Sequence, residues 1–97
     1  MDYPPKEIDG AEVIWYAVLD ENCRPTSACT HLVAGITLPP ASALAICPYD
    51  AGEGYFLFYC DAEWTILTDT WHSSIDAAMK QAEFEYEGIT GTWQRHA

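Results

Sequence analysis

Residues 55–71 read YFLFYCDAEWTILTDTW, and this stretch decides the fold. The runs 55–60 and 64–71 are rich in aromatic and β-branched residues, and the short polar sequence Asp61-Ala62-Glu63 separates them. Two such runs with a short polar connection predict a β-hairpin. Aromatic and β-branched side chains on both runs are suited to pairing across the two strands.

A helix is predicted directly after the hairpin. Ser73 fits an N-cap, and Asp76 three residues later fits its capping-box partner. Gly88 fits a left-handed glycine at the C-terminal end. Apolar residues recur between these signals at helical spacing, which predicts one apolar stripe: Ile75, Ala78, Met79, Ala82 and Tyr86.

The first half of the chain is less strongly patterned. Residues 12–19 (EVIWYAVL) are apolar on both faces and predict a central strand. Residues 31–38 (HLVAGITL) predict a second strand, weakened by Gly35. Residues 41–47 (ASALAIC) fit either a helical turn or a short edge strand.

Both ends of the chain are predicted to be extended. Residues 1–10 indicate an N-terminal arm, because Pro4-Pro5 excludes a helix and Gly10 punctuates its end. Residues 89–95 indicate a short final strand or a tail anchored by Trp93. The 97 residues therefore predict a single α+β domain. Its sheet would be mainly antiparallel, with four to five strands and one helix of the C-terminal half packed on one face.

The composition is strongly acidic. Fifteen acidic and four basic side chains give a formal net charge of -11. The hydrophobic content of 49% excludes intrinsic disorder despite this charge. Four cations are too few for sequence-independent binding of nucleic acid. The N-terminus lacks the basic and apolar regions of a signal peptide, and no run is apolar enough to span a membrane, so a cytoplasmic location is expected.

Histidines and cysteines do not form a recognisable catalytic or metal motif. Without a secretory segment the four cysteines are expected to be reduced, although a Cys23–Cys29 bridge is left open. Cys47 and Cys60 lie in or beside apolar runs and are expected in the core. No catalytic residue, cofactor or metal is therefore predicted. The alternative is a small metal-binding or Cys/His-dependent enzyme domain that uses Cys29, His31, Cys60 or His72.

The acidic residues suggest two binding patches. The sequence Glu83-Phe84-Glu85-Tyr86-Glu87 ends the predicted helix, and Phe84 lies off its apolar stripe. We therefore expect Glu83, Phe84, Glu85 and Glu87 to contact a partner, with Phe84 as an aromatic anchor. The alternative for Phe84 is contact with the C-terminal tail or with Trp93. Asp61 and Glu63 in the hairpin turn form the second expected patch.

Part of the chain resembles a known kind of protein. The segments Phe58-Tyr59-Cys60-Asp61, Asp69-Thr70-Trp71-His72 and 81–88 (QAEFEYEG), together with Trp64, resemble small, stand-alone, uncharacterised acidic bacterial proteins. The size and acidity are also similar to those of bacterial immunity proteins and of phage-borne inhibitors such as anti-CRISPR proteins. This second resemblance is one of general character, so it implies a binding role and transfers no residue.

Charge, size and the absence of a catalytic motif together predict a non-catalytic binding protein. Its partner would be a basic protein, or the basic nucleic-acid-binding site of a protein complex, with no direct binding of nucleic acid or membrane. Carboxylates would occlude the cationic site, as in an immunity protein, an inhibitor or a nucleic-acid mimic. A homodimer formed through a sheet edge such as residues 31–38 is a further possibility.

Overall fold

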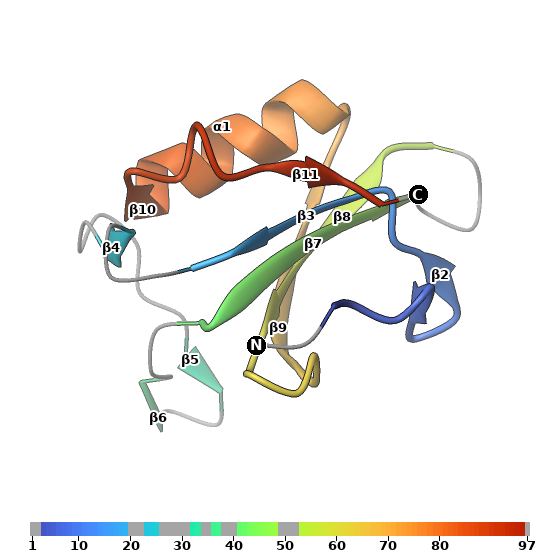
Figure 1. The fold of residues 1–97 in the computed structure, drawn as a ribbon, viewed down its shortest axis with the longest axis horizontal. Coiled ribbons are helices and arrows are strands. Elements are labelled where there is room, and N and C mark those ends of the chain that lie inside the picture. The colour runs from blue at the N-terminus through green and yellow to red at the C-terminus, as the bar shows by residue number, and fades with distance from the viewer. Residues whose placement is uncertain are drawn as a thin grey trace.

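A five-stranded sheet and one helix form the centre of the computed structural model, which describes residues 3–19, 23–25, 32–33, 36–37, 41–48 and 53–96. The strand order is β11–β3–β7–β8–β9, and all neighbouring strands are antiparallel. Helix α1 (Ile75–Glu85) lies across one face of the sheet (Figure 1). The predicted α+β class is confirmed.

The strands of this sheet are β3 (Trp15–Val18), β7 (Ala43–Pro48), β8 (Tyr55–Cys60), β9 (Ile66–His72) and β11 (Gln94–Arg95). The remaining described strands form two-stranded pairs. These are β1 (Glu7–Ile8) with β2 (Ala11–Glu12), β4 (Arg24–Pro25) with β10 (Tyr86–Glu87), and β5 (Leu32–Val33) with β6 (Ile36–Thr37). The single strand predicted over 31–38 is wrong, because its two described halves pair with each other.

Strand β7 contradicts both alternatives predicted for residues 41–47, a helical turn and a short edge strand. It is the middle strand of the sheet, with β3 on one side and β8 on the other. Leu44 and Ile46 face the helix, Ala45 and Cys47 face the opposite side, and all four are fully buried. Because both faces are covered, the strand lacks the alternation of apolar and polar residues that marks a half-exposed strand.

The predicted hairpin is present, with strand β8 at the predicted residues. Strand β9 begins at Ile66 instead of Trp64, because residues 62–64 form a three-residue loop. The Trp64 N–H donates to the Asp61 carbonyl (3.1 Å), and the Asp61 N–H donates to the Thr65 carbonyl (2.9 Å). Trp64 adopts a φ of 64°, a left-handed conformation that glycine usually supplies in this loop. Its indole packs edge-on against Tyr16, at 6.0 Å between ring centroids, and is almost completely buried.

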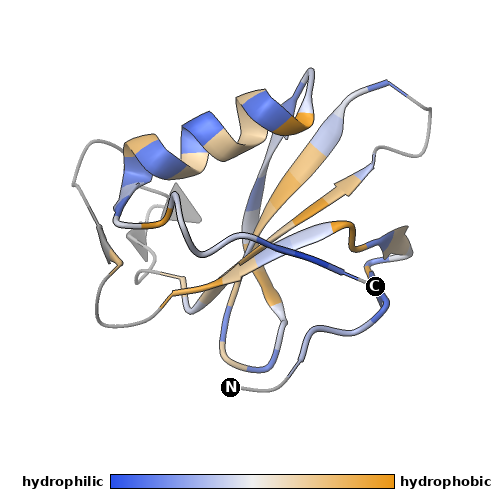
Figure 2. Cartoon of the chain, turned by 45° about the horizontal axis from the view of Figure 1, so that its top comes forward, coloured by the Kyte–Doolittle hydropathy of each residue, from blue (hydrophilic) through white to orange (hydrophobic). Residues whose placement is uncertain are grey.

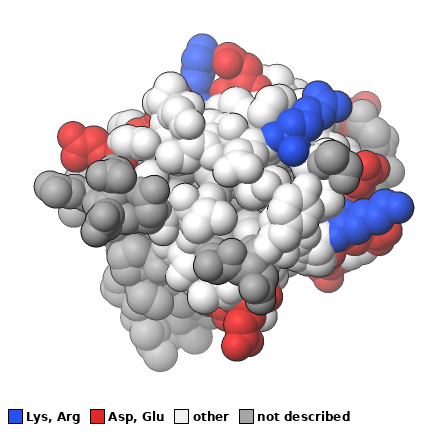
Figure 3. All heavy atoms as spheres, viewed as in Figure 1, with Lys and Arg blue, Asp and Glu red and all other residues white. Residues whose placement is uncertain are grey.

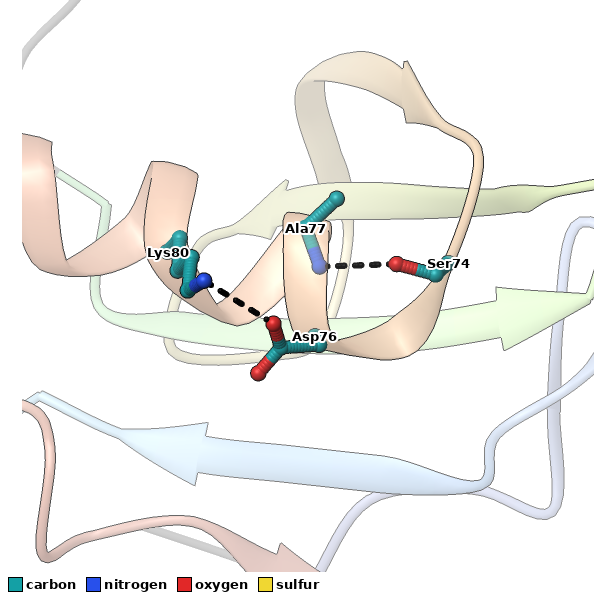
Figure 4. Close-up of polar contacts among 4 residues, drawn as sticks. All are labelled: Ser74, Asp76, Ala77 and Lys80. Carbon is teal, nitrogen blue, oxygen red and sulfur yellow. Dashed lines mark hydrogen bonds and ion pairs between the residues drawn. The ribbon is translucent and has the colours of Figure 1, made fainter.

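Helix α1 begins one residue later than predicted. Its N-cap is Ser74, whose hydroxyl oxygen accepts a hydrogen bond from the Ala77 N–H at 3.0 Å (Figure 4). The predicted capping box of Ser73 and Asp76 is therefore wrong, and Asp76 instead forms an exposed ion pair with Lys80 at 3.2 Å. Gly88 does have a left-handed φ of 84°, but β10 separates it from the end of the helix, so it is not the helix cap.

The N-terminal segment covers the face of the sheet opposite the helix. Residues 7–12 form the β1–β2 hairpin, and the two residues of its turn, Asp9 (φ 52°) and Gly10 (φ 81°), both have positive φ, as a type I′ turn requires. Ile8 and Ala11 are buried against this face together with Val13. The extended arm predicted for residues 1–10 is therefore wrong from Glu7 onward. Figure 2 shows the resulting sheet as mostly hydrophobic strands between these two covers.

Candidate binding surfaces

The end of helix α1 carries part of the predicted patch. Glu83 and Glu87 are exposed, and Phe84 between them is 58% exposed. The Thr90 hydroxyl donates a hydrogen bond of 2.8 Å to Glu83 Oε1 and holds that carboxylate near the following turn. We call Glu83, Phe84 and Glu87 the helix-end patch. It combines one exposed aromatic side chain with two exposed carboxylates.

Glu85 does not belong to this surface. It is 4% exposed, and its carboxylate accepts hydrogen bonds from the Tyr59 hydroxyl and from Gln81 Nε2, the latter at 3.1 Å. Glu85 follows Ala78 and Ala82, both fully buried, at helical spacing, so it lies on the apolar stripe. The expectation that Glu85 contacts a partner conflicts with this burial, and its role here is to attach the helix to strand β8.

Thr70 and His72 extend this polar contact along strand β9. A hydrogen bond of 2.7 Å joins Thr70 Oγ1 to His72 Nε2. Burial raises the pKa of Tyr59, the hydrogen bond to Glu85 raises it further, and a hydrogen bond from Thr70 lowers it. The contacts of Thr70 thus connect strand β9 to the polar group formed by Tyr59 and Glu85.

Asp61, the first residue of the second predicted patch, is occupied within its own turn. Its Oδ1 accepts hydrogen bonds of 2.9 Å from the backbone N–H groups of Glu63 and Thr65. These bonds fix the loop that positions Trp64. Asp61 is half-buried, whereas Glu63 at the tip of the loop is exposed. Of the two predicted residues, Asp61 therefore stabilises the turn, whereas Glu63 is exposed to solvent.

Glu63 lines a groove between this turn and the N-terminal segment. The groove has a volume of about 400 Å³. Two further carboxylates, Glu7 and Asp9, line it from the β1–β2 hairpin. We call it the hairpin groove, and its lining residues are Pro5, Glu7, Ile8, Asp9, Glu63, Trp64, Thr65 and Ile66.

The sequence analysis missed Glu7 and Asp9 as partners of Glu63. The signal that could have identified them is Asp9-Gly10, the dipeptide most typical of a two-residue hairpin turn. A hairpin there returns the chain onto the sheet and brings Glu7 and Asp9 beside the β8–β9 turn. Without that hairpin, an N-terminal arm has no predicted neighbour.

Acidic side chains are not confined to these two surfaces. Four of the fifteen, Asp2, Asp20, Glu21 and Asp50, lie outside the described residues. In the view of Figure 3, the described carboxylates lie around the edge of the face and its centre is uncharged. The negative charge is therefore distributed over several elements, and the hairpin groove differs in combining three carboxylates with a concave surface.

The described cysteines are free thiols. Cys47 and Cys60 are fully buried in the core, as predicted, and burial raises the pKa of each to about 12. The buried Cys23 places its Sγ 3.8 Å from the Gly88 carbonyl oxygen. Cys29 and His31 of the alternative enzyme or metal site lie outside the described residues. Among the residues that are described, no three His, Cys, Asp or Glu side chains are grouped to hold a metal ion.

Within the described part of the chain, no helix has the length and apolar character needed to cross a membrane. Comparison of the chain with protein-family models, with curated proteins and with solved structures finds no match.

Proposed function

We propose that this protein is a non-catalytic binding protein whose carboxylates occlude a basic surface of a partner. The partner would be a toxin, as for an immunity protein, or the nucleic-acid-binding site of a protein complex. The observation that carries the proposal is the placement of exposed carboxylates beside aromatic or apolar groups. Glu83, Phe84 and Glu87 are all exposed at the end of α1 and in β10, and Glu7, Asp9 and Glu63 line the hairpin groove.

Most of these carboxylates are available for intermolecular pairing. Among the residues whose side chains the structure describes, Lys80 is paired with Asp76, and no ion pair involves Glu83 or the acidic residues of the hairpin groove. Glu87 lies opposite Arg24 in the pairing of β10 with β4. The net charge of -11 would attract a cationic partner over about 10 Å at 0.1 M salt and accelerate its association. Apolar and aromatic groups among the charges would add contact area that does not depend on salt.

A nucleic-acid mimic would act in the same way. Its carboxylates would occupy the positions at which a basic groove binds phosphates, so an oligonucleotide and this protein would compete for one site. The oligonucleotide would not bind this protein directly, because both are negatively charged. A competition experiment with an oligonucleotide therefore distinguishes the two kinds of partner. An oligonucleotide would displace this protein from a nucleic-acid-handling complex, but not from a toxin that binds no nucleic acid.

The test uses the immobilised protein to capture partners from cells that naturally produce it, with two variants in parallel. The first removes two carboxylates from each surface: Glu7→Gln, Glu63→Gln, Glu83→Gln and Glu87→Gln. The matched control removes the same charge from other exposed positions: Glu12→Gln, Glu53→Gln, Asp69→Asn and Asp76→Asn. We expect a captured protein with a positive surface that the control retains and the first variant loses. Equal retention by both variants, or a partner without a positive surface, contradicts the proposal.

A further inference from the structure

We infer that the hairpin groove is the docking site for an extended, lysine- or arginine-bearing loop of the partner protein. This inference rests on the proposed function and specifies the surface and the recognition chemistry. At about 400 Å³ the groove lies near the lower end of the size range of ligand pockets, roughly 300–1,000 Å³. It therefore suits a few side chains of a loop and is too small for a folded element.

The charge of the groove selects a cationic occupant. The β1–β2 hairpin contributes Glu7 and Asp9 to the groove, and the turn between β8 and β9 contributes Glu63. All three are exposed, and among the described residues none of them forms an ion pair. Lysine and arginine side chains on a loop would supply the missing partners, and like charges would be rejected.

The apolar lining selects an occupant with a hydrocarbon portion. The groove is also lined by the exposed Pro5, by the half-buried Ile66 and by the largely buried Ile8 and Trp64. The methylene stems of lysine and arginine pack along such surfaces while their charged ends reach carboxylates. Short apolar side chains between the cations would contact the same residues. This combination favours a peptide loop in which basic and apolar residues alternate.

Both walls of the groove are fixed before a partner arrives. Asp9 belongs to a two-residue turn with the positive φ values that this turn type requires. The backbone of Glu63 is held by the 2.9 Å hydrogen bond to Asp61, and the neighbouring Trp64 is buried in the core. Binding therefore has to order little of the backbone, which preserves affinity in a small contact.

The probe is a fluorescent, end-blocked peptide, Gly-Lys-Val-Lys-Val-Lys-Gly, and binding is measured by fluorescence anisotropy at low salt. The groove variant carries Glu7→Gln, Asp9→Asn and Glu63→Gln. The matched control carries Glu53→Gln, Asp69→Asn and Asp76→Asn, exposed positions outside both proposed surfaces, and reduces the net negative charge equally. We expect about tenfold weaker binding for the groove variant and less than about twofold for the control, because only nearby charges act on the peptide at close range.

Two results overturn the inference, and they differ from failure of the proposed function. Equal weakening by both variants means that total charge alone attracts the peptide, and the groove has no special role. Equally tight binding of a peptide with glutamate in place of lysine would show that the groove does not select a cationic occupant. By contrast, the proposed function fails when the captured partner is retained by the variant with Glu7, Glu63, Glu83 and Glu87 replaced, whatever the result with the peptide.

Discussion

The Tyr59 hydroxyl donates a hydrogen bond to the buried Glu85 carboxylate and joins strand β8 to the last turn of helix α1. Glu85, which the sequence analysis expected on the surface, is thus buried and stabilises the packing of the helix on the sheet. Gln81, one helical turn earlier, donates a second hydrogen bond to the same oxygen. The negative charge of the protein therefore divides into carboxylates that hold the fold and carboxylates that are open to a partner.

Replacing Glu85 tests this division. Glu85→Ala leaves the buried Tyr59 hydroxyl without its acceptor, and we expect a loss of about 2–3 kcal/mol in the free energy of unfolding. The neighbouring exposed change Glu83→Ala should cost less than about 0.5 kcal/mol. Urea denaturation of the two variants measures both values. Equal effects would mean that Glu85 is no more structural than its exposed neighbour.

The packing of Trp71 over Gly54 gives a second prediction. A Cβ atom at Gly54 would lie 2.4 Å from the Trp71 ring, and the φ of Gly54 is +85°. Gly10 has a similar φ of +81° with open space around it, and Gly91 has open space and no such φ. We expect Gly91→Ala to be nearly neutral, Gly10→Ala to cost about 1 kcal/mol, and Gly54→Ala to cost clearly more.

Thermal or urea unfolding of the three alanine variants gives the ranking directly. Gly91→Ala serves as the control for the general effect of adding a methyl group. Gly10 and Gly54 have similar backbone conformations and differ in the Trp71 ring beside Gly54, so a Gly54→Ala variant no more destabilising than Gly10→Ala would contradict this packing.

The secondary structure was easier to predict for elements with one buried face than for elements buried on both faces. The hairpin and helix of residues 55–85 were predictable because aromatic runs, a polar turn and a single apolar stripe are local signals. Strand β7 was ambiguous because its alternation is erased by burial on both sides. The groove was missed because it joins residues 7–9 to residue 63, and only the type I′ turn at Asp9-Gly10 brings them together.

The buried thiols should be inert in the folded protein. Cys47 and Cys60 are fully buried, and burial raises their pKa to about 12, so very little reactive thiolate exists at pH 8. We expect iodoacetamide to label both residues only as fast as the protein unfolds. Mass spectrometry of digests, with and without guanidinium chloride, measures this labelling. Rapid modification of either residue in the native protein would contradict its placement in the core.

His72 should remain neutral to a lower pH than a free histidine. Burial lowers its pKa below the ordinary value of 6.5, and the Glu85 carboxylate partly opposes this shift. The unfolded chain therefore binds a proton at a pH where the folded chain does not, and the contribution of His72 to stability decreases as the pH falls below 6.5. Titration by NMR should give a pKa under 6.5 for His72.

Two variants sharpen this measurement. Glu85→Gln removes the opposing carboxylate and should lower the pKa of His72 further. His72→Gln should weaken the dependence of the unfolding free energy on pH below 6.5. A His72 that titrates at or above 6.5 would contradict the effect of its burial, and a His72 pKa unaffected by Glu85→Gln would contradict its interaction with Glu85.

The central claim is that this protein binds through charge complementarity, and the salt dependence of the captured partner's Kd tests it most directly. Isothermal titration calorimetry between about 50 and 300 mM NaCl should show Kd rising by about tenfold or more, because salt screens exposed charges. A Kd that stays constant over this range would contradict electrostatic occlusion as the basis of binding.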